Sequence, residues 1–229
     1  MRQLVVVELQ REGGEADEIG EADGRDVLAA PSAADRALTI GFADLVGFTA
    51  LSQSITPQEL AAIVDRFEAI AYEHIPERGG RVVKMIGDEI MFAVPDGAFA
   101  ADIALALVDA CARDSLVPDV RIGLASGPTL SWEGDLYGPT VNLASRIVSI
   151  AYAASVVVSS DIHDALADDE QLRWKSLRTR QLKDIGRVQL WAVRRASDDF
   201  EKEGVRQRAR RRRGSVRDKV ADLVERRDD

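Results

Sequence analysis

Two aspartates lie where a packed core has no use for a charge. Asp44 ends the apolar run 38–43, and Asp88 lies in the short link between the strand-like runs 81–86 and 89–94. Adjacent carboxylates repel and raise each other's pKa unless a cation lies between them. Oxygen ligands without an accompanying His or Cys favour Mg²⁺ or Mn²⁺ over Zn²⁺. If the two runs are neighbours in one sheet, these residues predict a site for a hard divalent cation.

Each aspartate also has an ordinary structural explanation. Asp is a common N-cap of helices, which is the alternative for Asp44. Asp is also common in tight turns, which is the alternative for Asp88. Taken one at a time, the structural and metal-binding interpretations carry equal weight, so other residues have to decide between them.

A second polar pair lies further along the chain. Asn142 and Arg146 are four residues apart in a segment with a helical pattern, so their side chains project from one face, one turn apart. An Arg without a partner is costly in apolar surroundings, and the neighbours of this pair are Val141, Leu143, Ala144 and Ile147. The pair therefore predicts a ligand-binding face, with a solvated helix face as the alternative.

Alternating strand and helix patterns position these residues. The run 38–43 is typical of a buried strand. The segment 56–59 (TPQE) predicts a helix start with a capping box, and Gly79-Gly80 predicts its end. The runs 81–86 and 89–94, joined by two residues, predict a hairpin with Asp88 in its turn.

The remaining pattern completes the fold. A helix over 97–112 and a strand over 120–125 give the order β-α-β-β-α-β, which is ferredoxin-like. The fold class is therefore α+β, a ferredoxin-like βαββαβ core with additional C-terminal helices and strands. We expect these additions to be a helix from about 141, a strand at 156–158, a short helix near 162 and strands at 172–177 and 188–193.

Composition limits what the chain can be. Its 229 residues, 46% hydrophobic and 30% charged, fit one domain with extensions. The single cysteine, Cys111, excludes an internal disulfide framework and a multi-cysteine zinc site, and we expect it to pack in the core. The sequence shows no apolar run of about 20 residues and no secretory leader, so we expect a cytoplasmic protein without a membrane span.

Charge and glycine content predict the boundaries. We predict an acidic, Gly-rich linker over residues 1–36, the globular domain over 37–196 and a charged, Arg-rich tail over 197–229. The tail is basic, whereas the chain as a whole has a net charge of −9. The cluster 206–213 is a candidate for binding nucleic acid or an anionic membrane face. A solvated tail is the favoured interpretation, so nucleic acid is not an expected partner.

Three motifs occur in order within the globular segment. They are Phe42-x-Asp44-Leu45-x-Gly47-Phe48-Thr49, Lys84-Met85-Ile86-Gly87-Asp88-Glu89 and Asp135-x-x-Gly138-x-x-Val141-Asn142-x-Ala144-x-Arg146. Each motif alone is modest, but the three in order are specific. With them, residues 37–196 resemble the catalytic domain of class III nucleotidyl cyclases of the soluble bacterial kind.

The resemblance implies a role for each motif residue. It places two divalent cations, Mg²⁺ or Mn²⁺, on Asp44 and Asp88, with the Leu45 carbonyl as an extra ligand. One ion activates the ribose 3′-hydroxyl for in-line attack on the α-phosphorus, and the other steadies the departing pyrophosphate. Arg146 is implied to donate to the α-phosphate oxygens, and Asn142 to position the ribose.

The positions that read the base correspond to Lys84 and Asp135. Adenine offers an acceptor at N1 and a donor at its amino group, which suit an ammonium and a carboxylate. Guanylyl cyclases of the family typically carry Glu and Cys there, so ATP is the expected substrate. The alternative for Lys84 is a lysine that protects a sheet edge. Lys183 matches a lysine that contacts the polyphosphate, but Asp184 stands where the family often has Gly.

The family places its site between two catalytic domains, and this chain contains both halves. The resemblance therefore implies a homodimer with two composite sites. The predicted function is an adenylate cyclase that converts ATP to 3′,5′-cyclic AMP and pyrophosphate. The alternatives are a guanylate or mixed-specificity cyclase and a noncatalytic nucleotide-sensing module. Regulation is expected either to come from an unidentified partner or to be absent.

Overall fold

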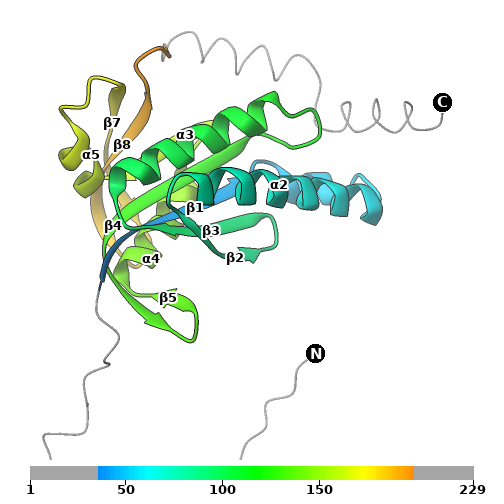
Figure 1. The fold of residues 1–229 in the computed structure, drawn as a ribbon, viewed down its shortest axis with the longest axis horizontal. Coiled ribbons are helices and arrows are strands. Elements are labelled where there is room, and N and C mark those ends of the chain that lie inside the picture. Colours follow the sequence, from blue (N-terminus) through cyan, green and yellow to red (C-terminus); the bar gives the residue numbers. More distant parts are fainter. Residues whose placement is uncertain (1–35, 199–229) are drawn as a thin grey trace, which may run out of the picture. The chain divides into compact units, whose positions relative to one another are not determined.

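A computed structural model of the chain describes residues 36–198, which form a mixed sheet with helices on both faces (Figure 1). The strands are β1 (Arg36–Leu45), β2 (Arg81–Ile86), β3 (Glu89–Val94), β4 (Val120–Trp132), β5 (Asp135–Tyr137), β6 (Ser155–Ser159), β7 (Leu172–Leu182) and β8 (Gly186–Arg195). The helices are α1 (Phe48–Ser52), α2 (Pro57–Glu77), α3 (Gly97–Arg113), α4 (Pro139–Ile150) and α5 (Ser160–Leu166). Nearly all of the predicted linker and tail lies outside the described residues.

The sheet has the order β2-β3-β1-β4-β6-β8-β7, and β5 pairs with β4 beside this path. Strands β2, β3, β1 and β4 are antiparallel neighbours, and α2 and α3 connect them. This is the predicted ferredoxin-like βαββαβ core, and the predicted α+β fold class is confirmed. Strand β6 runs parallel to β4, and the antiparallel pair β8 and β7 extends the sheet.

Local sequence signals produce the elements that were predicted around the aspartates. At the start of α2, the Thr56 amide donates to Glu59 Oε2 at 2.7 Å and the Glu59 amide donates to Thr56 Oγ1 at 3.3 Å. This reciprocal capping box satisfies two amides that the helix itself leaves unpaired. Strands β2 and β3 are joined by the two residues of the predicted turn, in which Gly87 has φ 65°.

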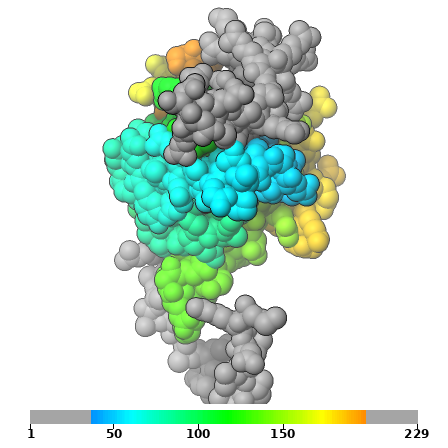
Figure 2. Space-filling view, turned by 90° about the vertical axis from the view of Figure 1, so that its right-hand side faces the viewer, coloured from blue at the N-terminus to red at the C-terminus, as the bar shows by residue number. Residues whose placement is uncertain are grey.

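The structure differs from the predicted elements in the middle of the chain. Strand β4 continues to Trp132 and returns as β5 through a turn at Glu133 and Gly134, whose φ angles are 50° and 83°. The green segment that contains this hairpin projects from the body of the domain (Figure 2). The predicted strand 120–125 is the buried first half of β4, whereas residues 131–134 at the tip of the hairpin are exposed and only Leu136 of β5 is buried. The tip therefore lacks a continuous apolar run. Helix α1 was likewise not predicted.

The core has one layer on each face of the sheet. Helices α2 and α3 cover one face, where Phe67, Phe92 and Ile103 are fully buried. Helix α4 covers the other face and buries Ala144 and Ile147 against the strands. Cys111 is buried in the first layer, which confirms its predicted place. Within residues 36–198, no helix is long and apolar enough to cross a membrane.

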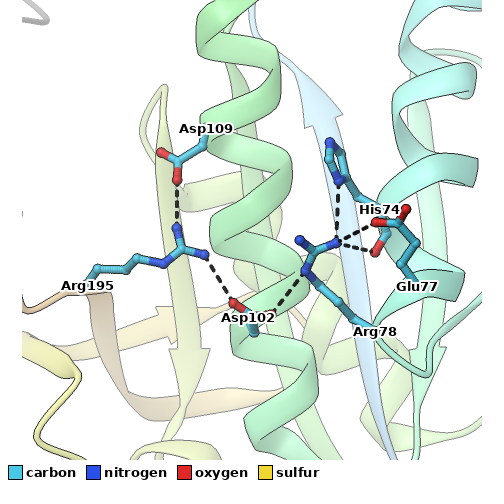
Figure 3. A network of polar contacts seen from close by, with 6 residues as sticks. All are labelled: His74, Glu77, Arg78, Asp102, Asp109 and Arg195. Carbon is cyan, nitrogen blue, oxygen red and sulfur yellow. Dashed lines mark hydrogen bonds and ion pairs between the residues drawn. The ribbon is translucent and has the colours of Figure 1, made fainter.

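An ion-pair network ties α2, α3 and β8 together on the outer face (Figure 3). Arg195 donates to Asp109 at 2.7 Å and to Asp102 at 3.1 Å. Arg78, the residue that ends α2, donates to the same Asp102 at 3.0 Å. These side chains are between 28% and 54% exposed, so each pair contributes only a fraction of a kcal/mol up to about 1 kcal/mol. The network helps to orient α3 relative to the last strand.

Candidate active site

The sheet register brings Asp44 and Asp88 together. Asp44 is the next-to-last residue of β1 and pairs with Glu89 at the start of β3. The amide of Leu45 donates to the carbonyl oxygen of Asp88 at 3.3 Å. The turn between β2 and β3 therefore lies against the end of β1. The N-cap alternative for Asp44 is wrong, because Asp44 lies within β1 and the N-cap of the next helix, α1, is Gly47. Asp88 does lie in the β2–β3 turn, as its structural alternative describes.

The electrostatics at this end of the sheet show an excess of negative charge. Partial burial raises the pKa of Asp88, and the charge of Asp44 raises it further. Burial, followed by the charges of Asp44 and Asp88, raises the pKa of Glu89 to about 7. A divalent cation relieves this kind of repulsion, and the carboxylate oxygens are ligands that Mg²⁺ and Mn²⁺ prefer. The donor set therefore fits such ions.

Side chains alone do not complete a metal centre. Among the residues that the structure describes, no group of three or more His, Cys, Asp or Glu side chains is arranged to hold a metal ion. A centre on Asp44 and Asp88 thus needs further oxygen ligands from the backbone, from water or from a bound phosphate. The Leu45 carbonyl, in the same strand end, is the backbone ligand that was predicted.

Arg121 is a site residue that the sequence did not predict. It lies directly opposite Asp44 in the register of β1 and β4, and its Nε donates to Asp44 Oδ2 at 2.5 Å. Its Nη1 also donates to the carbonyl oxygen of Ser149 in α4, at 3.3 Å. No local motif marks this arginine, because its role follows only from the pairing of strands distant in sequence. It offsets part of the acidic charge and connects the aspartates to α4.

Helix α4 presents Asn142 and Arg146 on its outward face. Asn142 is exposed, and the side chain of Arg146 is 42% exposed, with Nη2 at 3.4 Å from Asp184 Oδ2. The expectation of apolar surroundings for Arg146 is wrong, because Ala144 and Ile147 turn toward the sheet on the opposite face. In a single chain this is a solvated face, and the pair is open to a ligand or to a second protein surface.

Lys84 and Asp135 form an ion pair of 2.5 Å between β2 and β5. Strand β2 is an edge strand, and Lys84 follows a register shift in it. The edge-lysine alternative therefore describes the position of Lys84, but it does not account for the ion pair with Asp135. The hydrogen bond from Lys84 is the main reason why the pKa of Asp135 lies below its usual value. A donor and an acceptor thus stand side by side, as recognition of a base edge requires.

Lys183 lies in the turn between β7 and β8, where its side chain is exposed. The next residue, Asp184, has a left-handed backbone with φ 63°. Left-handed geometry favours Gly, the residue that the resemblance implies for this position. Through Asp184, this turn lies beside Arg146 of α4.

Comparison with known proteins places this arrangement in a family. Residues 31–195 match the family described as the adenylate and guanylate cyclase catalytic domain. The chain belongs to this family. Two solved structures show the same fold: the adenylyl cyclase CyaB from P. aeruginosa, with a TM-score of 0.64 and 21% identity over 72% of this chain and 97% of that one, and the guanylate cyclase domain of RhGC from Catenaria anguillulae, with a TM-score of 0.64 and 22% identity over 70% and 97%.

Three curated relatives of this cyclase domain come from bacteria. An adenylate cyclase of Streptomyces coelicolor is 45% identical over 58% of this chain and 35% of its own length. An adenylate cyclase of Glutamicibacter nicotianae is 38% identical over 74% and 41%. A pH-sensitive adenylate cyclase of Mycobacterium tuberculosis is 34% identical over 76% and 45%. The chain therefore spans less than half the length of these relatives.

Proposed function

We propose that this chain is an adenylate cyclase that converts ATP to 3′,5′-cyclic AMP and pyrophosphate. The proposal rests above all on the meeting of Asp44 and Asp88 at one end of the sheet. The relatives at 34–45% identity that carry the name adenylate cyclase support it. So does the Lys84–Asp135 pair, whose chemistry suits adenine.

The residues divide the reaction between them. Asp44, Asp88 and the Leu45 carbonyl would hold Mg²⁺ or Mn²⁺, two per site, which supply the charge that acidifies the ribose 3′-hydroxyl and stabilises the leaving pyrophosphate. Arg146 donates to the α-phosphate oxygens, where negative charge develops during in-line attack. Asn142 orients the ribose. Lys183 is a cation available to the rest of the triphosphate, whereas Arg121, paired with Asp44, offsets acidic charge beside the metal ligands. Because orientation and charge supply the catalysis, no side-chain general base is needed.

Lys84 of β2 and Asp135 of β5 select ATP over GTP in this proposal. The Lys84 ammonium donates to N1 of adenine, and the Asp135 carboxylate accepts from the amino group. Guanine presents a carbonyl oxygen at that position, which leaves the carboxylate facing another acceptor. A mismatch between polar groups of this kind discriminates strongly between substrates.

The acting unit is proposed to be a homodimer. Within one chain, Asp44 forms an ion pair with Arg121, and Arg146 forms an ion pair with Asp184. Asp44 and Arg146 therefore do not contact each other in a single protomer. In a twofold dimer, the acidic end of one protomer meets α4 and the β2–β5 pair of the other, which gives two equivalent sites.

Turnover tests the activity directly. The full chain is incubated with ATP and either Mg²⁺ or Mn²⁺, and cyclic AMP is measured. We expect product from the wild type and a loss of at least about 100-fold in Asp88→Asn. Asp168→Asn, which removes the same charge from an exposed turn after α5, should leave the rate unchanged. Nucleotide binding without product in the wild type would instead support a noncatalytic module, and faster turnover of GTP would support a guanylate cyclase.

Complementation tests the shared site. Asp44→Ala and Arg146→Ala proteins are each expected to be inactive. In an equal mixture with random exchange, about half of the dimers are mixed and each has one intact site of two, so about a quarter of wild-type activity should return. Asp44→Ala mixed with Asp88→Ala is the matched control, because both lesions lie in the same half-site and no dimer is repaired. Absence of rescue in the first mixture, with mixed dimers demonstrated, would contradict composite sites.

A further inference from the structure

The carboxylate of Asp184 occupies a position next to the guanidinium of Arg146. The Nη2–Oδ2 distance is 3.4 Å, and the two side chains are 42% and 70% exposed. The contact joins α4 to the β7–β8 turn, two elements that are far apart in sequence. A single, partly exposed contact of this length is weak, and a stronger anionic partner can replace it.

The fold holds the two groups near each other. Leu182, at the end of β7, is 2% exposed and lies in the same core layer as Ala144 and Ile147 of α4. Leu182 also pairs with Gly186 across the turn, and its carbonyl accepts a hydrogen bond from Ile185 at 3.3 Å. The turn is therefore anchored beneath the helix, and Asp184 is placed beside Arg146 by packing.

The backbone of this turn makes the choice of residue informative. Asp184 has φ 63°, a conformation that Gly adopts without cost and that Asn and Asp tolerate better than other residues. Gly would satisfy the turn without adding charge. The turn geometry therefore does not require the negative charge of the Asp184 carboxylate or its ion pair with Arg146.

We propose that Asp184 is a positioning residue that holds the Arg146 guanidinium in the resting protein and that the α-phosphate of the substrate displaces. The inference depends on the role proposed above for Arg146. Because carboxylate and phosphate compete for one guanidinium, Asp184 lowers the affinity for nucleotide without taking part in the chemical step. An exposed ion pair of this kind predicts an effect of about twofold to sixfold on the dissociation constant.

Binding of an α,β-methylene analogue of ATP to the full chain, in the presence of Mg²⁺, measures this competition by calorimetry. Asp184→Asn and Asp184→Gly both remove the charge and suit the left-handed backbone. We expect either variant to bind about twofold to sixfold more tightly than the wild type. The KM for ATP should fall by the same factor, with kcat unchanged. Asp168→Asn should change neither constant.

The arginine must carry the effect. In an Arg146→Ala background, Asp184→Asn should no longer alter binding of the analogue, because the guanidinium for which carboxylate and phosphate compete is absent. Tighter binding that persists in this background would overturn the proposal in favour of a general charge effect. Unchanged binding in both Asp184 variants, or a fall in kcat with unchanged binding, would overturn it as well. The binding cycle needs no turnover, so a chain that binds the analogue but forms no cyclic AMP would refute the proposed activity and still decide the role of Asp184.

Discussion

Gly123 controls how closely α4 approaches the sheet. A Cβ atom added at this position in β4 would lie 2.3 Å from the backbone nitrogen of Val148 and 2.8 Å from the carbonyl oxygen of Ala144. Both atoms belong to the backbone of α4, so no side-chain rotation relieves the clash. An ordinary contact is about 3.5 Å. Gly123→Ala therefore forces the helix away from the sheet by roughly 1 Å.

Two effects of that displacement are measurable. Overpacking of this kind costs about 1–3 kcal/mol of the free energy of unfolding, which urea titration followed by circular dichroism measures. Because α4 carries Asn142 and Arg146, a misplacement of about 1 Å should also lower kcat/KM for ATP by about 100-fold. The loss of activity should exceed what the population of unfolded chains explains.

A second glycine supplies the control. At Gly97, the first residue of α3, an added Cβ would find its nearest neighbour at 3.7 Å, an ordinary contact. Gly97→Ala should be neutral, or stabilising by up to about 1 kcal/mol, with wild-type activity. If Gly123→Ala matched Gly97→Ala in both stability and activity, close packing of β4 against α4 could not be what positions the site.

Three further predictions concern single side chains. Burial acts to raise the pKa of Asp114, but hydrogen bonds from Arg66 and from two backbone amides outweigh it and lower the pKa. The stability that this carboxylate contributes is present above about pH 4 and is lost as pH falls through the native pKa. Asp114→Asn should therefore cost about 1 kcal/mol at pH 7 in urea titrations, and this cost should shrink as the pH falls below about 4. Burial, reinforced by nearby acidic groups, raises the pKa of Cys111 to about 12, so a thiol reagent at pH 8 should modify it only after urea unfolding; rapid labelling of the native protein would contradict its placement. Asp135→Asn should reduce the ratio of kcat/KM for ATP over GTP by at least about tenfold, because an amide can donate to the guanine carbonyl; an unchanged ratio would remove Asp135 from base recognition.

Local chemistry was enough to predict most of the fold. The capping box at Thr56 and Glu59 and the two-residue turn at Gly87 and Asp88 are each encoded within a few consecutive residues, so their geometry depends little on the rest of the chain. The distal half of β4 and the β4–β5 hairpin were missed because residues 131–134 are exposed and Leu136 is the one buried residue of β5, so this part of the chain shows no continuous apolar run. Helix α1, of five residues, is too short for a periodic pattern.

The amino-acid sequence by itself determined the family and the identities of the candidate residues, because three motifs occur in order along one chain. Only the tertiary structure decided their partners. The pairing of β1 with β4 sets Arg121 against Asp44, and the packing of the β7–β8 turn beneath α4 sets Asp184 against Arg146. The physical reason is that an ion pair forms between groups that are close in space, and sheet register and core packing bring distant segments together.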